Sequence, residues 1–499
     1  MNKKIVLLLF TFLCVFFTAP AQWTQTGEDI DGEAAYDNSG TSVSLSSDGL
    51  VVAIGARAND GNGDMSGHVR VFKNYNELWT QIGDDIDGEG EGDYFGEAVS
   101  LNYDGSIVAA SSNINTPDEE DSGQVRIFQN INNTWTQIGQ NLDGEAPGYQ
   151  FGHSVSLSMD GLVVAIGTPY YSNGEEYSIG NTQIFQYIDN TWTQIGQDII
   201  GEAEGDHSGL SVSLSDSGSI VAIGANNNNG NGNGSGHVRV YQNYNGTWTQ
   251  IGEDIDGEAP FDHSGFSVSL SSDGLVVAIG AWVNDDNGDM SGHVRVYKNI
   301  EGTWIQIGQD IDGEAIYDNS GQTVSLNSDG MIVAIGARMN DGNGYNSGHA
   351  RIYNYINQTW VQIGQDIDGE NIGDHSGYSV SLNDDGTKVA IGARNNSGNG
   401  TSSGHVRVFE NSILSTSETI ILRESLYPNP TKGILYLKHT NNNNLLVYIY
   451  DITGKLTFEK QLFFKKSLSQ IDISNFENGI YLIKIQDNNQ LYTAKVVKQ

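Results

Sequence analysis

The sequence of 499 residues is almost free of cysteine. Its single cysteine, Cys14, lies in an N-terminal segment that we expect to be removed from the mature protein. One cysteine cannot form an intramolecular disulfide, which excludes the disulfide-stapled class of small secreted domains. The stability of the fold must therefore come from packing.

Basic side chains are also scarce: the chain has 24 Lys and Arg against 62 Asp and Glu, a formal net charge of -38. The imbalance lies in residues 22–411, which hold 12 basic and 55 acidic side chains, whereas residues 425–499 hold 9 basic and 5 acidic ones. So acidic a body repels nucleic acid and anionic lipid, because phosphate binding requires Lys and Arg. The acidity fits either a solubilising surface or a surface that binds cations.

Long hydrophobic runs are absent beyond the N-terminus. Lys3 and Lys4 precede an apolar run over residues 5–17, and Ala-Pro-Ala ends at Ala21. Thirteen residues are too few to span a bilayer, and the small residues suit signal peptidase. We therefore expect a signal peptide over residues 1–21, cleaved between Ala21 and Gln22, export from the cytoplasm, and no transmembrane segment.

What the sequence does contain is a repeat of unusual regularity. The phrase Trp-Thr-Gln-x-Gly, or a close variant, recurs at steps of 56 or 57 residues. Such a period indicates one supersecondary unit, duplicated and stacked on its neighbours to bury a core. The seven copies start at Trp23, Trp79, Trp135, Trp192, Trp248, Trp304 and Trp360.

Each unit predicts four short antiparallel strands. In the fifth unit, residues 267–271 alternate polar and apolar, the Asp273-Gly274 pair predicts a hairpin turn, and residues 275–280 are almost all apolar. Residues 293–297 and 304–308 supply the third and fourth strands. Four-stranded sheets repeated radially are propeller blades, so we predict an all-β, seven-bladed β-propeller over residues 22–411. Because no fourth strand follows the last unit, the segment at Trp23 must close the ring.

The unit resembles the FG-GAP repeat of integrin-like propellers. Phe95-Gly96 and Phe151-Gly152 stand where that repeat begins its inner strand, and Gly-Ala ends the second strand in five units, as at Gly280-Ala281. The family's calcium-binding Asp-x-Asp-x-Asp-Gly loop lies between the first and second strands. This chain has only a tight turn there, so that site does not carry over.

Residues 425–499 resemble the type IX secretion sorting domain of Bacteroidota. Four motifs match in order: a Pro-x-Pro-x-x-Gly segment, a hairpin at 451–455, a Gly-x-Tyr segment and a basic end. We expect a small β-sandwich, joined to the propeller by a linker over residues 412–424. The resemblance implies passage through the type IX machinery to a secreted or outer-surface location. The matching residues are Pro428, Pro430, Gly433, Gly479, Tyr481, Lys495 and Lys498.

The loop between the second and third strands is the best metal candidate. In two units it places carboxylate or amide oxygens at alternate positions, and glycine permits the sharp turn, a pattern that suits Ca²⁺. Ordinary turn chemistry uses the same residue types, and no closing Glu is present, so both interpretations stay open. The candidate ligands are Asp60, Asn62, Asp64, Asp285, Asn287 and Asp289.

Residues that recur in every blade mostly serve the blade. We therefore expect the histidines that open the third strands and the Asp-Ile-Asp-Gly-Glu connections to be structural. Departures from the repeat are better ligand candidates, because exposed aromatic rings beside carboxylates can stack on sugars and bind their hydroxyl groups. These departures are Trp282, Tyr170, Tyr171, Glu175 and Glu176.

No nucleophile elbow, zinc signature or phosphate-binding loop is present, so we expect no enzyme. The favoured function is an exported, non-enzymatic binding or adhesion propeller that recognises polysaccharide or protein. Two alternatives remain: an extracellular glycan-acting enzyme with a site on the propeller axis, and a structural surface-coat protein. Symmetry-breaking carboxylates at one axial mouth would favour the enzyme.

Overall fold

The computed structural model describes residues 23–114, 122–411, 420–421, 426–427, 431–438, 445–451, 456–462, 468–476, 478–487 and 490–499. The predicted signal peptide with its cleavage site at Ala21 and Gln22 lies outside these residues, as does most of the predicted linker. The chain divides into two compact units, Met1–Asn411 and Ser412–Gln499, and each is described by itself.

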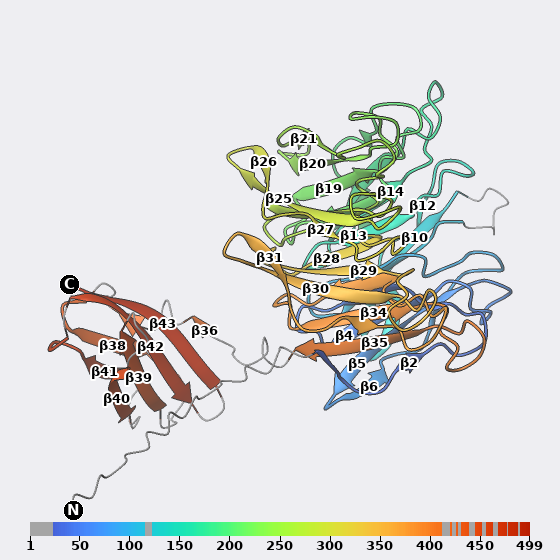
Figure 1. The fold of residues 1–499 in the computed structure, drawn as a ribbon. Helices are drawn as coiled ribbons and strands as arrows, with labels where there is room; N and C mark the ends of the chain where they lie inside the picture. The colour runs from blue at the N-terminus through green and yellow to red at the C-terminus, as the bar shows by residue number, and fades with distance from the viewer. Residues whose placement is uncertain are drawn as a thin grey trace, which may run out of the picture. The chain divides into compact units, whose positions relative to one another are not determined.

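The first unit is a propeller of seven blades, and the described residues form no helix (Figure 1). The inner strands are β3 (Ser39–Leu45), β8 (Val99–Leu101), β13 (Ser154–Leu157), β18 (Ser211–Leu214), β23 (Ser267–Leu270), β28 (Thr323–Leu326) and β33 (Ser379–Leu382). The second strands are β4 (Val51–Ala56), β9 (Ile107–Ser112), β14 (Val163–Thr168), β19 (Ile220–Ala225), β24 (Val276–Ala281), β29 (Ile332–Ala337) and β34 (Lys388–Ala393).

The third strands are β5 (His68–Tyr75), β10 (Gln124–Ile131), β15 (Asn181–Ile188), β20 (His237–Asn243), β25 (His293–Ile300), β30 (His349–Ile356) and β35 (His405–Asn411). The fourth strands are β6 (Leu78–Gln81), β11 (Thr134–Gln137), β16 (Thr191–Gln194), β21 (Trp248–Gln250), β26 (Thr303–Gln306), β31 (Thr359–Gln362) and, for the last blade, β1 (Trp23–Gln25).

Each blade also has a fifth, two-residue strand that the repeat pattern did not predict. The chain bends after the fourth strand and pairs again with the first two residues of the third strand. These short strands are β7 (Ile86–Asp87), β12 (Leu142–Asp143), β17 (Ile199–Ile200), β22 (Ile255–Asp256), β27 (Ile311–Asp312), β32 (Ile367–Asp368) and, in the last blade, β2 (Ile30–Asp31).

The turn between the first and second strands shows why the local sequence folds this way. Gly274 has a φ of +71°, a left-handed conformation that a side chain would strain. The Asp273 carboxylate accepts a hydrogen bond from the backbone N–H of Leu275 at 2.9 Å and one from the Ser271 hydroxyl at 2.7 Å. The turn is thus held by its own side chains.

The N-terminal strand closes the ring, as predicted. β1 pairs antiparallel with β35, with Trp23 opposite Asn411, and β2 pairs with the start of β35. The last blade therefore contains strands from both ends of the propeller sequence, so neither end is left as an unpaired edge.

Two rings of hydrogen bonds run around the propeller axis. In each blade, the hydroxyl of an inner-strand serine accepts a hydrogen bond from the N–H of the last inner-strand leucine of a neighbouring blade, at 2.9–3.0 Å. Two residues after each of these leucines, a backbone N–H donates to the carbonyl of the equivalent residue in the next blade, at 2.9–3.1 Å. These seven hydrogen bonds close a ring through Ser47, Tyr103, Met159, Asp216, Ser272, Ser328 and Asp384.

The apolar core lies between adjacent blades. The second strands are buried on both faces, and each core cluster draws on two neighbouring sheets. The recurring tryptophan spans the same contact: its indole N–H donates to a carbonyl of the neighbouring blade in all seven copies, at 2.7–2.8 Å. We call each such contact between blades a seam.

The second unit has two sheets. One joins β36 (Ile420–Ile421), β43 (Gln490–Lys498), β42 (Gly479–Asp487), β39 (Leu445–Asp451) and β40 (Leu456–Leu462); the other joins β37 (Leu426–Tyr427), β38 (Ile434–Lys438) and β41 (Leu468–Asp472). Leu435, Ile471, Ile449, Ile483 and Val496 are fully buried, as in the predicted small sandwich.

Among the described residues, we find no helix that is both long enough and apolar enough to cross a membrane.

Candidate functional site

Buried arginines recur at the seams of the propeller. The third strand begins His-x-Arg in five blades, and the arginine donates from Nη2 to a backbone carbonyl of the preceding short strand at 2.6–2.9 Å. The same group lies 3.4–3.8 Å from the Glu of the connection between blades. These arginines therefore fasten one blade to the next.

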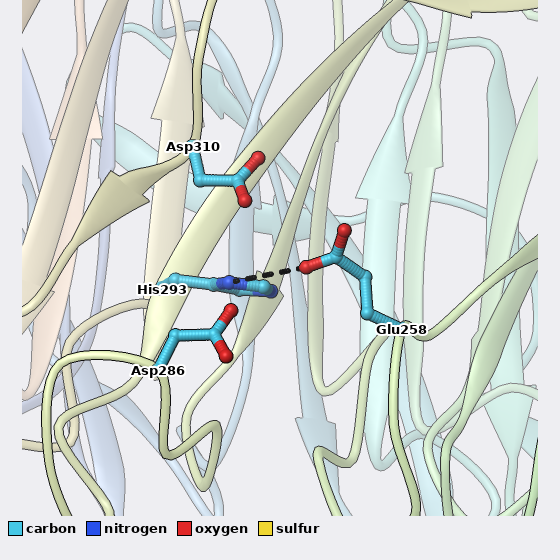
Figure 2. Close-up of side chains that lie close together, drawn as sticks. All are labelled: Glu258, Asp286, His293 and Asp310. Carbon is cyan, nitrogen blue, oxygen red and sulfur yellow. Dashed lines mark ion pairs between the residues drawn. The ribbon is translucent and has the colours of Figure 1, made fainter.

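The histidine two positions earlier faces the same glutamate. In blade 5 the Nδ1 atom of His293 lies 3.9 Å from Oε2 of Glu258, and Asp286 and Asp310 flank the imidazole (Figure 2). One ligand atom from each of the four residues lies within 4.8 Å of the others. The equivalent clusters, which we call the seam clusters, are Glu33–His68–Asp85, Glu202–His237–Asp254, Glu314–His349–Asp366 and Asp29–Glu370–His405.

The seam clusters have strongly perturbed protonation. Burial lowers the pKa of His293 to about 4, and the neighbouring Arg295 adds to the effect. Burial raises the pKa of Glu258, although Arg295 opposes it. The imidazole is thus neutral at physiological pH and faces the Glu258 carboxylate, which burial makes costly to ionise.

In the predicted calcium loops, side chains form hydrogen bonds with nearby backbone groups. The Asp60 carboxylate accepts from the N–H of Met65 at 2.9 Å, and the Asn62 amide donates to the carbonyl of Gly88 at 2.8 Å. In blade 5 the Asp285 carboxylate accepts from the N–H of Met290, and the Asn287 amide donates to Gly313.

The last positions of these loops differ between the two blades. The Asp289 carboxylate accepts from the Tyr317 hydroxyl at 2.6 Å, and Asp64 is exposed. The calcium interpretation remains a prediction. In blade 5 it is Asp286, not its neighbours Asp285 or Asn287, that joins the seam cluster.

In blade 3, the two tyrosines of the predicted aromatic site pack on different partners. Tyr170 packs on His207 with ring centroids 4.9 Å apart, and Tyr171 packs on Tyr149 at 5.3 Å. Glu175 is exposed and Glu176 accepts from Asn173 at 3.2 Å. Both tyrosine rings therefore have protein partners.

The departure at Trp282 belongs to a larger feature. The inner strands begin at one end of the axis, which we call the loop-end mouth. Two repeat positions meet there in several blades. The first follows the Ser-Gly or Phe-Gly pair and differs in every blade: Thr41, Glu97, His153, Leu210, Phe266, Gln322 and Tyr378. The second follows the second strand: Arg57, Asn113, Pro169, Asn226, Trp282, Arg338 and Arg394.

One sector of the loop-end mouth is basic. The guanidinium carbons of Arg394 and Arg338 lie 3.8 and 5.5 Å from the centroid of the Tyr378 ring, where cation–π attraction operates. Arg57 forms an ion pair with Glu97 at 2.9 Å. Six of the other nine basic residues of the propeller are the buried seam arginines or their blade 2 counterpart, so this sector stands out in an acidic body.

These groups lie close enough together to shift one another's pKa. Burial lowers the pKa of Arg394, and the like charge of Arg57 lowers it further. Burial opposes ionisation of Arg57, but the adjacent Glu97 carboxylate outweighs it and raises the pKa. Burial also lowers the pKa of His375, with contributions from Arg338 and Arg394.

The adjacent sector, in blade 5, is aromatic. Phe266 and Trp282 lie with ring centroids 5.3 Å apart, and both are partly buried. The sequence pattern singled out Trp282 but missed its neighbours. Aligning the seven copies would have found them, because the position of Tyr378 is occupied by seven different residues in an otherwise repetitive chain.

The other end of the axis, where the inner strands end in hairpin turns, has a hollow of about 740 Å³. Tyr103, Met159, Leu162 and Asp216 are among its lining residues. Nearby on the backbone ring, Asp384 has its pKa raised, chiefly by burial. We call this the hairpin-end mouth.

The sorting-motif residues lie in the second unit. Gly433 has a φ of +138°, and a side chain there would meet the Cα of Ser474 at 2.6 Å. Tyr481 is buried against Phe476, and the Lys498 ammonium donates to Asn478 at 3.4 Å.

The structure describes two of the remaining four motif residues. Gly479 begins β42 and Lys495 lies in β43. Pro428 and Pro430 fall outside the described residues.

Comparison with known families agrees with this architecture. Residues 425–499 match the secretion system C-terminal sorting domain, and residues 30–72 and 255–297 match the FG-GAP repeat. The chain thus contains a seven-bladed propeller with FG-GAP repeats and ends in a type IX sorting domain. The sorting domain indicates interaction with the type IX machinery and a secreted or outer-surface location.

Solved structures with some likeness include a candidate 6-phosphogluconolactonase from Bacteroides uniformis, at 15% identity and a TM-score of 0.47, covering 66% of this chain and 86% of that one. The periplasmic gluconolactonase PpgL of Pseudomonas aeruginosa has 15% identity and a TM-score of 0.45, covering 66% and 85%. Sqt1 of Chaetomium thermophilum, bound to the N-terminus of ribosomal protein L10, has 13% identity and a TM-score of 0.46, covering 77% and 100%. No curated protein matches the chain.

Proposed function

We propose that the chain is a non-enzymatic recognition propeller, displayed or released outside the cell, which binds an extracellular polysaccharide or protein at its loop-end mouth. The proposal rests on the architecture of an exported propeller and on the distribution of differences among its blades.

One observation supports the position of the site. Repeat positions in the seams keep the same residue in most blades, whereas the position of Tyr378 has a different residue in all seven. A ring with only a structural role would not require seven different side chains at this position. A single asymmetric ligand does, because each of its faces meets a different blade.

The chemistry of the mouth indicates what the ligand presents. Arg57, Arg338 and Arg394 occupy one sector, and guanidinium groups bind carboxylate or sulfate groups with two parallel hydrogen bonds. Phe266 and Trp282 occupy another sector, where a sugar ring or an apolar side chain can stack. We therefore expect an anionic ligand with a flat apolar face, such as an acidic polysaccharide.

Binding to polysaccharides of matched size tests the proposal. The purified full-length chain is titrated with polygalacturonate and with neutral dextran. We expect saturable binding to polygalacturonate and none to dextran. Equal binding to both would contradict the role of the arginines, and binding to neither would favour a protein ligand or a structural coat.

A second candidate function draws on the hairpin-end mouth. Its hollow is lined by Asp104, Asp160 and Asp216 beside Tyr103, and glycan hydrolysis requires a pair of carboxylates. If the chain cleaves a glycan there, Asp216→Asn abolishes product release without loss of folding. Product release by wild type that survives in Asp216→Asn removes Asp216 from consideration.

A further inference from the structure

Five buried histidines have no hydrogen-bond partner among the described residues. Both ring nitrogens of each imidazole are enclosed, and the side chains are 1% exposed. A buried polar group without a partner is costly, and such groups in native proteins are rare. They are His68, His237, His293, His349 and His405, the histidines of the seam clusters.

Each imidazole nevertheless faces carboxylates. Its Nδ1 atom lies 3.6–4.0 Å from one or two carboxylate oxygens, too far for a hydrogen bond. The Glu comes from the connection that enters the blade, and the Asp comes from the bend before the short strand. Because the same spacing recurs in five blades, it is a property of the repeat.

Blades 2 and 3 provide natural comparisons. In blade 2 the histidine is replaced by Gln124, whose amide donates to Asp143 at 2.9 Å and to Glu89 at 3.4 Å. The cluster Asp is replaced there by Asn141, which donates to Glu89 at 3.5 Å. In blade 3, Asn181 donates to Asp198 at 3.4 Å. Where histidine is missing, amide donors thus approach the carboxylates directly.

We propose that each seam cluster binds one divalent transition-metal ion of the Zn²⁺ type, through the histidine Nδ1 and the carboxylates of the Glu and Asp. One imidazole nitrogen with two carboxylate oxygens is a donor set that suits Zn²⁺ and its neighbours better than Ca²⁺, which prefers six to eight oxygens. The cation satisfies a lone pair of the imidazole and neutralises the facing carboxylates. In blade 2 the amide N–H groups take that place.

The ion would fasten blades that no disulfide can link. In the last blade, His405 and Glu370 meet Asp29, which belongs to the N-terminal segment that closes the ring. An ion at this cluster would hold the two ends of the propeller sequence together. The inference does not depend on the proposed ligand site at the loop-end mouth.

Metal retention by the full-length chain tests the inference. The protein is stripped with a chelator, incubated with ZnCl₂ or CaCl₂, desalted and analysed by plasma mass spectrometry. We expect about five zinc ions per chain, no retained calcium, and a higher melting temperature with zinc than with chelator. Fewer than about one zinc per chain, or retention of calcium alone, overturns the proposal.

Variants that copy the residues of blade 2 locate the ions. Replacing all five cluster histidines by Gln should abolish zinc retention, and His293→Gln alone should remove about one ion. The fold should persist because Gln already occupies this position in blade 2, and far-ultraviolet circular dichroism checks it. His207→Gln, outside the clusters, is the matched control and should retain all the zinc.

Blade 2 also allows a gain of binding. Gln124→His combined with Asn141→Asp recreates the cluster with Glu89 and should add about one zinc ion per chain. Zinc retention after all five cluster histidines are replaced by Gln would overturn the proposal, since the ions would then lie elsewhere.

Discussion

The seams and the loop-end mouth use the same repeat in opposite ways. At the seams most blades have the same residues and contacts. An indole N–H donates to the neighbouring blade in all seven copies, and a His-x-Arg pair occurs in five. At the mouth the blades keep the backbone and change the side chains, so that Glu97, Phe266 and Tyr378 occupy equivalent places. The comparison teaches that symmetry in this chain belongs to stability and that asymmetry marks the place where function is to be sought.

The largest effect is expected at a seam tryptophan. Trp248 is 3% exposed and its indole donates to the carbonyl of Ile195 at 2.8 Å. Trp248→Ala should lower the free energy of unfolding by about 3–5 kcal/mol, from lost burial and a cavity between blades. Urea denaturation measures it. Ile305→Ala, at an exposed position of the next blade, is the control and should change stability by less than about 0.5 kcal/mol.

Two single arginine substitutions, one at a seam and one at the mouth, test the same comparison. Arg351→Met removes a charge-assisted hydrogen bond to the Asp312 carbonyl and should lower the free energy of unfolding by about 2 kcal/mol. Arg338→Met, at the mouth, should lower it by less than about 1 kcal/mol, because it loses mainly a cation–π contact. Equal losses in denaturation experiments would show that the mouth arginines are structural as well.

Binding should show the reverse dependence. Arg394→Gln should weaken polygalacturonate binding about tenfold, or about 1.4 kcal/mol, with little change in melting temperature. Arg351→Gln should leave the affinity within about twofold. Calorimetric titration of both variants measures the difference, and an unchanged affinity for Arg394→Gln would count against the basic sector.

The smallest effect is a pH dependence at the mouth. Because burial and then Arg338 and Arg394 lower the pKa of His375 below its ordinary value of 6.5, the side chain is neutral at pH 7 and gains a positive charge only as the pH falls further. Polygalacturonate remains ionised, so its affinity should rise by about two- to threefold between pH 7.5 and 5.5. His375→Asn should remove the rise, whereas His263→Asn, at the equivalent place of another blade, should not.

Much of the fold followed from the sequence because repetition multiplies weak signals. Seven copies of one pattern predicted the blades, and the phase of the copies predicted the closing strand at Trp23. The short strand at Ile86–Asp87 was missed, since two residues carry no periodicity. The sequence therefore predicts only a structural role for the Asp and Glu around it, and the structure groups some of them with the third-strand histidines.

The candidate site was harder to predict for a physical reason. The sequence places each third-strand histidine in its own blade, far from the other histidines, and so predicts a structural role for it. That argument concerned histidines meeting one another, but the contact is between one histidine and the acids of its own seam. Trp282 was noticed as a departure, but the proximity of Arg394 to Arg57 follows only when the ring is closed, because these two residues belong to the last and the first blade.

The most direct test of the central claim compares two sets of substitutions in one binding experiment. One variant combines Arg57→Gln, Arg338→Gln and Arg394→Gln at the loop-end mouth; the other combines Arg239→Gln and Arg295→Gln at the seams. Titration with polygalacturonate should show loss of binding for the mouth variant, with a near-native melting temperature, and retained binding for the less stable seam variant. Retained binding by the folded mouth variant would contradict the account.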